Sequence, residues 1–151
     1  MALEPLDGLL VVDLFAGSGA LGIEALSRGA RHAHFVERER GALAALETNL
    51  EALGLRDRTT IWKLDLERDL RPIRSVLAAA DLVLLDPPYR KDLAAATVTV
   101  LAESKLLGTH ARVIVEHHGK DVLPESIAGL KRTRQRRYGE TVVSTYASAP
   151  G

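Results

Sequence analysis

The stretch "GLLVVDLFAGSGALG" at residues 8–22 joins an unbroken apolar run to three closely spaced glycines. Such a run is typical of a strand buried on both faces of a parallel sheet. Gly17, Gly19 and Gly22 follow in the pattern G-x-G-x-x-G, which lets the backbone turn tightly and lets a ligand approach it closely. The strand, the glycine turn and a predicted helix over residues 18–28 indicate the first unit of a ligand-binding α/β sheet.

The rest of the chain continues the alternation of strand and helix. Strands are predicted at 32–37, 58–65, 81–86 and 111–118, and helices at 39–53, 67–79 and 92–107. Two further strand-like runs flank "YGET", which predicts a hairpin near the end of the sequence. This alternation favours a single α/β domain over residues 1–151, with a largely parallel sheet and helices on both faces.

In such sheets the ligand lies beyond the carboxyl ends of the strands. The predicted strands all end in a carboxylate at this edge, and these residues are Asp13, Glu37, Asp65, Asp86 and Glu116. We therefore expect the ligand-binding site at this edge of the sheet.

Composition limits the class of protein. The 151 residues are 46% hydrophobic and 26% charged, which is typical of a globular domain. The absence of cysteine excludes disulfides and thiolate chemistry, and it agrees with a cytoplasmic location. Neither a signal peptide nor a run of about 20 apolar residues is present, so we expect no membrane partner. We also expect a monomer. We expect no bound metal, because the adjacent His117 and His118 point to opposite faces of a strand.

Three strand-end carboxylates indicate which ligand the sheet binds. Glu37 follows Gly17 by 20 residues, a spacing that suits hydrogen bonds to ribose hydroxyls. Asp13 would repel a pyrophosphate near the glycine turn, so it favours a cationic ligand such as S-adenosylmethionine; the alternative is a buried or helix-capping role. Asp65 is expected to accept a hydrogen bond from adenine while Leu66 packs on the ring; the alternative is a solvated loop aspartate.

The stretch "LVLLDPPYRK" at residues 82–91 ends a buried strand on Asp86, followed by two prolines and Tyr89. Pro87 and Pro88 fix a stiff turn, so Asp86 and the Pro87 carbonyl become two acceptors at a fixed separation. They suit both hydrogens of an exocyclic amino group on a base that stacks on Tyr89. The turn therefore predicts methylation of such a nitrogen; the alternative is a rigid turn with a loose aromatic ring.

A basic segment, "KRTRQRR" at residues 131–137, carries five cations in seven residues. They are Lys131, Arg132, Arg134, Arg136 and Arg137. Contacts between such cations and phosphates bind nucleic acid regardless of its sequence. The segment predicts contact with RNA; the alternative is a solvated edge strand that charge protects from aggregation.

The motifs "VDLFAGSGALGIEALSRGA", "FVERER", "LVLLDPPY", "VIVEHH" and "YGET" resemble the RsmD-type bacterial methyltransferases, which methylate guanine N2 in small-subunit ribosomal RNA. The resemblance implies a Rossmann-like class I methyltransferase fold. It implies a three-layer sandwich with a seven-stranded mixed sheet in the order 3-2-1-4-5-7-6, strand seven being antiparallel. It implies S-adenosylmethionine as cofactor and ribosomal RNA or the small ribosomal subunit as partner. The family's basic N-terminal segment finds no match, so we expect a domain without that extension.

The resemblance also assigns site residues. The target base is assigned to Asp86, Pro87, Pro88 and Tyr89. The cofactor is assigned to Asp13, Phe15, Ala16, Gly17, Gly19, Glu37, Arg38, Asp65, Leu66 and Asp86. Three alternatives remain open from the residues alone: a DNA adenine or cytosine amino-methyltransferase, a nicotinamide-dependent oxidoreductase domain, and a non-catalytic RNA-binding remnant.

Overall fold

The structure is a computed structural model that describes residues 4–90 and 92–148. Its strands are β1 (Leu10–Leu14), β2 (His32–Glu37), β3 (Thr59–Lys63), β4 (Leu82–Leu85), β5 (Arg112–His118), β6 (Ser126–Ile127), β7 (Leu130–Tyr138) and β8 (Thr141–Ser148). Its helices are α1 (Ala20–Ser27), α2 (Arg40–Ala52), α3 (Arg74–Ala79) and α4 (Leu93–Ser104), with short 3-10 turns η1 (Arg56–Arg58) and η2 (Arg71–Ile73). None of the helices in the described ranges is long and apolar enough to cross a membrane.

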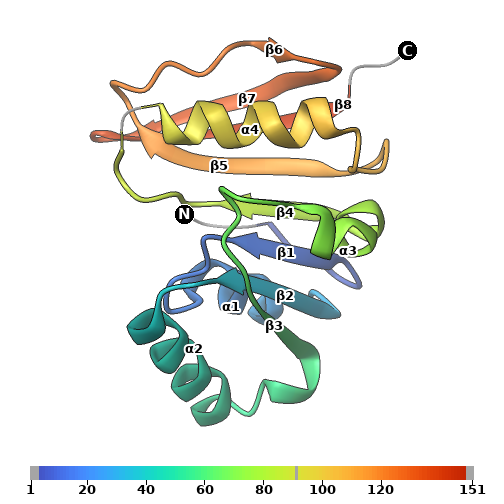
Figure 1. The fold of residues 1–151 in the computed structure, drawn as a ribbon, viewed down its shortest axis with the longest axis vertical. Helices are drawn as coiled ribbons and strands as arrows, with labels where there is room; N and C mark the ends of the chain where they lie inside the picture. The colour runs from blue at the N-terminus through green and yellow to red at the C-terminus, as the bar shows by residue number, and fades with distance from the viewer. Residues whose placement is uncertain (1–3, 91, 149–151) are drawn as a thin grey trace.

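The strands form one sheet in the order β3-β2-β1-β4-β5-β8-β7-β6 (Figure 1). Strands β1 to β5 run parallel, and β8 is antiparallel to both β5 and β7. The predicted order and the antiparallel strand are confirmed. The difference is one additional strand, β6, whose two residues at the edge of the sheet are too few to show any periodic pattern.

Helices cover both faces of the parallel part of the sheet. On one face, the buried ring of Phe35 belongs to a core formed with α1 and α2. On the other face, Leu77 of α3 and Val98 of α4 pack against the strands. Figure 1 shows α4 in front of the sheet and α1 behind it. The predicted three-layer sandwich is therefore confirmed, and burial of both apolar faces stabilises it.

Two differences between the predicted and the observed elements shape the cleft described below. Strand β3 ends at Lys63 instead of residue 65, which releases Asp65 from the sheet. The helix predicted over 67–79 becomes η2 followed by α3. The side chain of Asp69 accepts a hydrogen bond from the Arg71 backbone at 2.9 Å, which favours a local turn over a helix.

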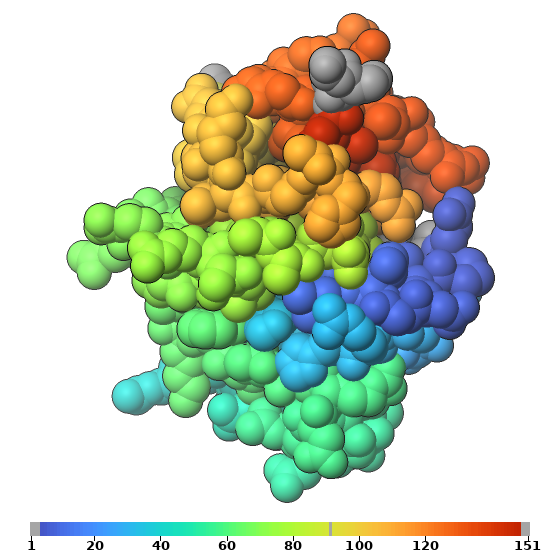
Figure 2. All heavy atoms as spheres, turned by 90° about the vertical axis from the view of Figure 1, so that its right-hand side faces the viewer, coloured from blue at the N-terminus to red at the C-terminus, as the bar shows by residue number. Residues whose placement is uncertain are grey.

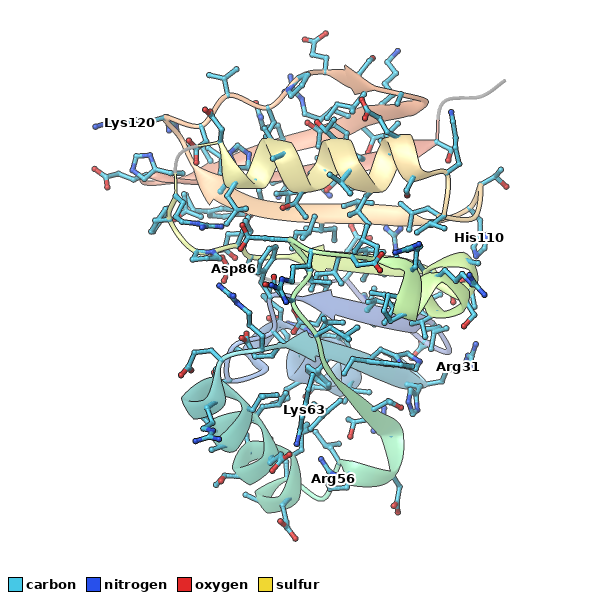
Figure 3. The ribbon with its side chains drawn as sticks, in the orientation of Figure 1. Arg31, Arg56, Lys63, Asp86, His110 and Lys120 are labelled. Atoms are coloured by element: carbon cyan, nitrogen blue, oxygen red, sulfur yellow. The ribbon has the colours of Figure 1, made fainter. Side chains whose placement is uncertain are left out.

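The parallel strands all end at one edge of the sheet, on the left in Figure 1. The opposite edge, which Figure 2 turns toward the viewer, is formed by the segments that precede these strands. Figure 3 places Asp86 at the first edge, and Arg31 and His110 at the second.

Candidate active site

A cleft of about 710 Å³ opens at the edge where β1, β2, β3 and β4 end. Four separate segments of the chain contribute to it, because the sheet order places their strands side by side. The lining combines apolar side chains with carboxylates. Its sequence-predicted members are Phe15, Gly17, Glu37, Arg38, Asp65, Leu66, Asp86 and Pro88.

The glycine loop reverses the chain between β1 and α1. Phe15, Gly17 and Gly19 have positive φ angles of 57°, 58° and 92°, a region that costs a phenylalanine energy but not a glycine. The other need for glycine is packing. A Cβ atom on Gly19 or Gly22 would come within 2.4 Å of a neighbouring side chain, which is Phe35 in the case of Gly22. Gly17 lines the cleft, whereas Gly19 leaves room for Leu46 of α2 and Gly22 lets α1 approach Phe35 of the sheet.

Asp13 lies beneath this loop and outside the cleft lining. Its side chain is only 1% exposed, and its Oδ2 atom accepts a hydrogen bond from the Gly22 backbone at 3.0 Å. Burial raises the pKa of Asp13 well above its usual value, although the bond from Gly22 opposes the rise. This geometry corresponds to the buried capping role that the sequence left as the alternative. Ala16 and Gly19 also lie outside the lining, so their contact with a cofactor remains a prediction.

Glu37 joins the glycine loop to the start of α2. Its Oε1 atom accepts a hydrogen bond from Gly17 at 2.8 Å, and its Oε2 atom accepts bonds from Arg38 at 2.9 Å and Glu39 at 2.8 Å. A carboxylate offers about four acceptor positions. Glu37 therefore has roughly one acceptor position left for a ligand. The three backbone bonds already fix the carboxylate in the place where we predict its contact with a ribose.

The segment after β3 forms the facing wall. Asp65 accepts a hydrogen bond from the Glu67 backbone at 3.0 Å and forms an ion pair with Arg38 at 3.1 Å. These two contacts fix the position of the partly exposed Asp65 side chain. Leu64 and Leu66 add apolar surface on either side of it.

Six residues that line the cleft were not predicted from the sequence, and two of them, Glu67 and Arg90, are charged partners that form an ion pair. The pair joins the loop after β3 to the loop after β4. A signal was available, because each residue follows a predicted strand end within a few positions.

Asp86 lies where the cleft meets a second cavity of about 200 Å³. Pro87, Pro88 and Tyr89 line this second cavity. The hydrogen bonds in the described parts of the chain include one from Arg90 to the Pro88 carbonyl and none to the Pro87 carbonyl. The proline turn therefore leaves the two predicted acceptors, Asp86 and the Pro87 carbonyl, beside one cavity.

Electrostatics and exposure distinguish this turn from a simple structural turn. Burial raises the pKa of Asp86, and the nearby charge of Glu116 raises it further. The Tyr89 side chain is 73% exposed, and its ring meets that of His118 edge to face at 5.6 Å between centroids. An exposed ring beside an acidic cavity is available to stack on a planar ligand.

The basic segment forms β7, but its five cations do not form one surface. Residues opposite each other in an antiparallel pair share a face, and Arg132 lies opposite the buried Tyr146. Arg132 forms an ion pair with Glu125 at 3.6 Å and donates to the Leu123 carbonyl at 3.3 Å. The opposite face of β7 carries the side chains of Lys131, Arg134 and Arg136, which pair with Ala147, Thr145 and Val143.

The described residues contain no group of three or more side chains that could hold a metal ion. His117 points inward, where its Nε2 atom is 2.8 Å from the Ser144 hydroxyl and its Nδ1 atom is 3.1 Å from the His118 carbonyl. It is a packed histidine in a hydrogen-bond network.

The strand order, the glycine loop after β1 and the acid at the end of β2 define an α/β domain of the class I methyltransferase type. A family profile described as Conserved hypothetical protein 95 matches residues 2–147. The chain therefore belongs to this family, the RsmD-type methyltransferases that its motifs resemble. Membership confirms the predicted family and, with it, S-adenosylmethionine as the cofactor. It decides against the oxidoreductase alternative.

Similar proteins come from several bacteria. YlbH of Bacillus subtilis, provisionally named an rRNA methyltransferase, is 38% identical over 93% of this chain and 76% of its own length. Ribosomal RNA small subunit methyltransferase D of Escherichia coli is 30% identical over 89% of this chain, which spans 66% of that protein. A solved structure of a conserved hypothetical protein from Streptococcus pyogenes is 38% identical, with a TM-score of 0.82 over 95% of this chain and 88% of that one.

Proposed function

We propose that this chain transfers a methyl group from S-adenosylmethionine to the N2 amino group of a guanine in small-subunit ribosomal RNA. The observation that carries the proposal is the position of the Asp86 to Tyr89 turn, at the junction of the large cleft and the smaller cavity. The Escherichia coli relative, named for methylation of small-subunit ribosomal RNA, supports the substrate class.

The large cleft fits the chemistry of this cofactor. Both cations that line it, Arg38 and Arg90, are already paired with carboxylates. Glu37 and Asp86 contribute further negative charge beside the apolar surface of Phe15 and Leu66. Such a cleft attracts a sulfonium and an ammonium and repels a pyrophosphate. We assign the ribose to Glu37 and the adenine to Asp65 and Leu66.

The transfer itself needs an aligned nitrogen and a place for one proton. S-adenosylmethionine supplies an activated methyl group, whose bond to sulfur breaks as its bond to the guanine nitrogen forms. Asp86 and the Pro87 carbonyl accept the two N–H hydrogens, which directs the nitrogen lone pair toward the methyl group. Asp86 also stabilises the positive charge that develops on the nitrogen, and it then takes up the released proton.

The target base has to leave any stack to reach Asp86. Tyr89 provides a ring on which the flipped base can stack, a contact worth about 1–3 kcal/mol. We assign the phosphate contacts to the face of β7 that is opposite Arg132. On this face, Arg134, Arg136 and Tyr138 line a hollow of about 300 Å³ together with Arg112. In this chain Arg134 already pairs with Glu4 at 3.5 Å.

The test is methylation of undermodified small ribosomal subunits with tritiated cofactor, followed by analysis of the labelled nucleosides. We expect label in N2-methylguanosine with the wild type, and loss of label with Asp86→Asn. In a parallel reaction with DNA in place of the subunits, label in N6-methyladenine or N4-methylcytosine would support the DNA alternative. Binding of RNA without any transfer would support the non-catalytic remnant.

A further inference from the structure

Glu116 lies beside Asp86, and no role was predicted for it beyond its place at a strand end. Strands β4 and β5 are parallel neighbours, with Leu85 paired to Val115. The next residue in each segment is a carboxylate. Asp86 directly follows β4, and Glu116 lies within β5 beside it, because neighbouring strands are about 4.8 Å apart. Both side chains line the smaller cavity together with the proline turn.

This pair of carboxylates has no cation to balance it in the described parts of the chain. None of the ion pairs or side-chain hydrogen bonds among residues 4–90 and 92–148 involves Asp86 or Glu116. Two like charges beside each other disfavour the ionised forms unless donors reach them. The cavity therefore favours a ligand that presents several N–H donors on one edge.

The bases differ in what they offer on that edge. Guanine carries an N1–H donor directly beside its N2 amino group. Adenine and cytosine carry an unprotonated ring nitrogen, an acceptor, beside their amino group. A base whose amino group is held by Asp86 and the Pro87 carbonyl can turn this neighbouring ring position toward Glu116, which lines the same cavity.

We propose that Glu116 is a specificity-determining residue that selects guanine by accepting a hydrogen bond from N1–H. The proposal rests on the proposed function and deepens it. A carboxylate that faces the lone pair of an adenine or cytosine ring nitrogen is repelled, and the half-buried carboxylate of Glu116 loses its partner. Glu116 thus accounts for selection among amino-bearing bases, a task that the Asp86 to Tyr89 turn cannot perform, because every amino group offers the same two hydrogens.

The test uses a short RNA that carries the methylated nucleotide either as guanine or as 2-aminopurine. 2-Aminopurine keeps the amino group at C2 but has an unprotonated N1 and no oxygen at C6, so it removes the N1–H donor assigned to Glu116 together with that oxygen. We expect the wild type to methylate guanine with a kcat/KM about 10- to 100-fold above that for 2-aminopurine. We expect Glu116→Gln to lose most of this preference, because its amide can donate to the unprotonated N1.

Two controls separate this role from a structural one. Glu103→Gln removes an exposed carboxylate on α4 and should leave the base preference unchanged. Calorimetric titration with S-adenosylhomocysteine should give the same affinity for Glu116→Gln as for the wild type, which shows an intact fold and cofactor cleft.

The outcomes are distinguishable. If the wild type labels guanine N2 and Glu116→Gln keeps the same preference for guanine over 2-aminopurine, the role of Glu116 is wrong while the proposed function stands. If the wild type places no label on guanine N2, the proposed function fails, and the selection assigned to Glu116 fails with it.

Discussion

Asp86 carries its charge in surroundings that disfavour it. Burial and the charge of Glu116 raise its pKa above the ordinary value of about 3.9. The proposed transfer needs the ionised form, because only a carboxylate can stabilise the developing charge and accept the proton. As the pH falls, Asp86 should therefore become protonated at a higher pH than an ordinary aspartate does.

Kinetics of Asp86→Asn test this assignment. The amide keeps the size of the side chain but removes the charge and the base, so we expect kcat to fall by about 100-fold or more. The affinity for S-adenosylhomocysteine, measured by calorimetry, should change by only a few-fold. In the wild type, the acid limb of the rate profile should lie above the ordinary aspartate range. A variant that keeps the wild-type rate would refute the role of Asp86.

Asp13 is buried and accepts a hydrogen bond from the Gly22 backbone, while its contact with the cofactor stays a prediction. Asp13→Ala leaves the Gly22 N–H without its partner, so the free energy of unfolding should fall by about 1–3 kcal/mol. Asp13→Asn keeps an acceptor and removes a charge that burial disfavours, so it should be close to wild type at neutral pH. Because the folded-state pKa is raised, the wild type should gain stability relative to Asp13→Asn as the pH falls. Denaturant unfolding at two pH values measures both effects, and an unchanged Asp13→Ala would contradict this reading.

The positions of residues were predictable where one local pattern sets them. The structure places Asp86, its prolines and Glu37 at the predicted strand ends, because each belongs to a pattern of residues that are adjacent in the sequence. The burial of Asp13 was not predictable in this way, since it depends on how closely α1 packs above it. The partnership of Arg90 with Glu67 depends on two loops that meet only in the folded chain.

At the scale of elements, α1 depends on glycine at one point of contact. A Cβ atom on Gly22 would lie 2.4 Å from Phe35 Cε1 and 2.7 Å from its Cζ. Gly22→Ala should therefore lower the free energy of unfolding by about 1–3 kcal/mol, despite the better helix propensity of alanine.

The matched control is Gly41→Ala at the start of α2. There the nearest atoms are the Glu39 carboxylate oxygens at 3.3 Å, so the change should stay within about 1 kcal/mol. Denaturant unfolding compares the two variants, and equal stabilities would show that the Phe35 contact yields easily.

Strand β7 divides its cations between two tasks. Arg136→Gln removes an exposed charge, so the slope of log affinity against log salt for RNA should become shallower by about 1. Arg132→Gln removes the contacts with Leu123 and Glu125, so it should instead lower the free energy of unfolding by about 1 kcal/mol. Fluorescence anisotropy over a salt series, with unfolding as the second measurement, separates the variants. Equal salt slopes for both variants would show that the two faces of β7 are not distinct.

Elements were predictable in proportion to their length and periodicity. Strand β2 has the predicted bounds, and α2 begins and ends within one residue of the prediction. Strand β6, with two residues, forms only because β7 offers its edge. The sequence of β7 shows five cations, but not the irregularity between Arg132 and Arg134 that sets which face each occupies.

At the scale of the whole molecule, cofactor binding should stabilise the fold, because the cleft draws on four segments that unfolding separates. S-adenosylhomocysteine at about 100 times its Kd adds roughly 2.7 kcal/mol to the free energy of unfolding. For a domain of this size that is an increase of roughly 5–10 °C in Tm. Thermal unfolding with and without ligand measures it.

NAD serves as the matched ligand in that experiment, since its pyrophosphate meets the carboxylates of the cleft and should leave Tm unchanged. Asp86→Asn should keep most of the shift. Glu37→Gln should lose it, because its amide group would turn N–H donors toward the backbone donors of Gly17, Arg38 or Glu39. The proposal that Glu37 holds both the glycine loop and the ribose predicts this difference between two carboxylates of one cleft. A full shift in Glu37→Gln would show that the ribose is bound elsewhere.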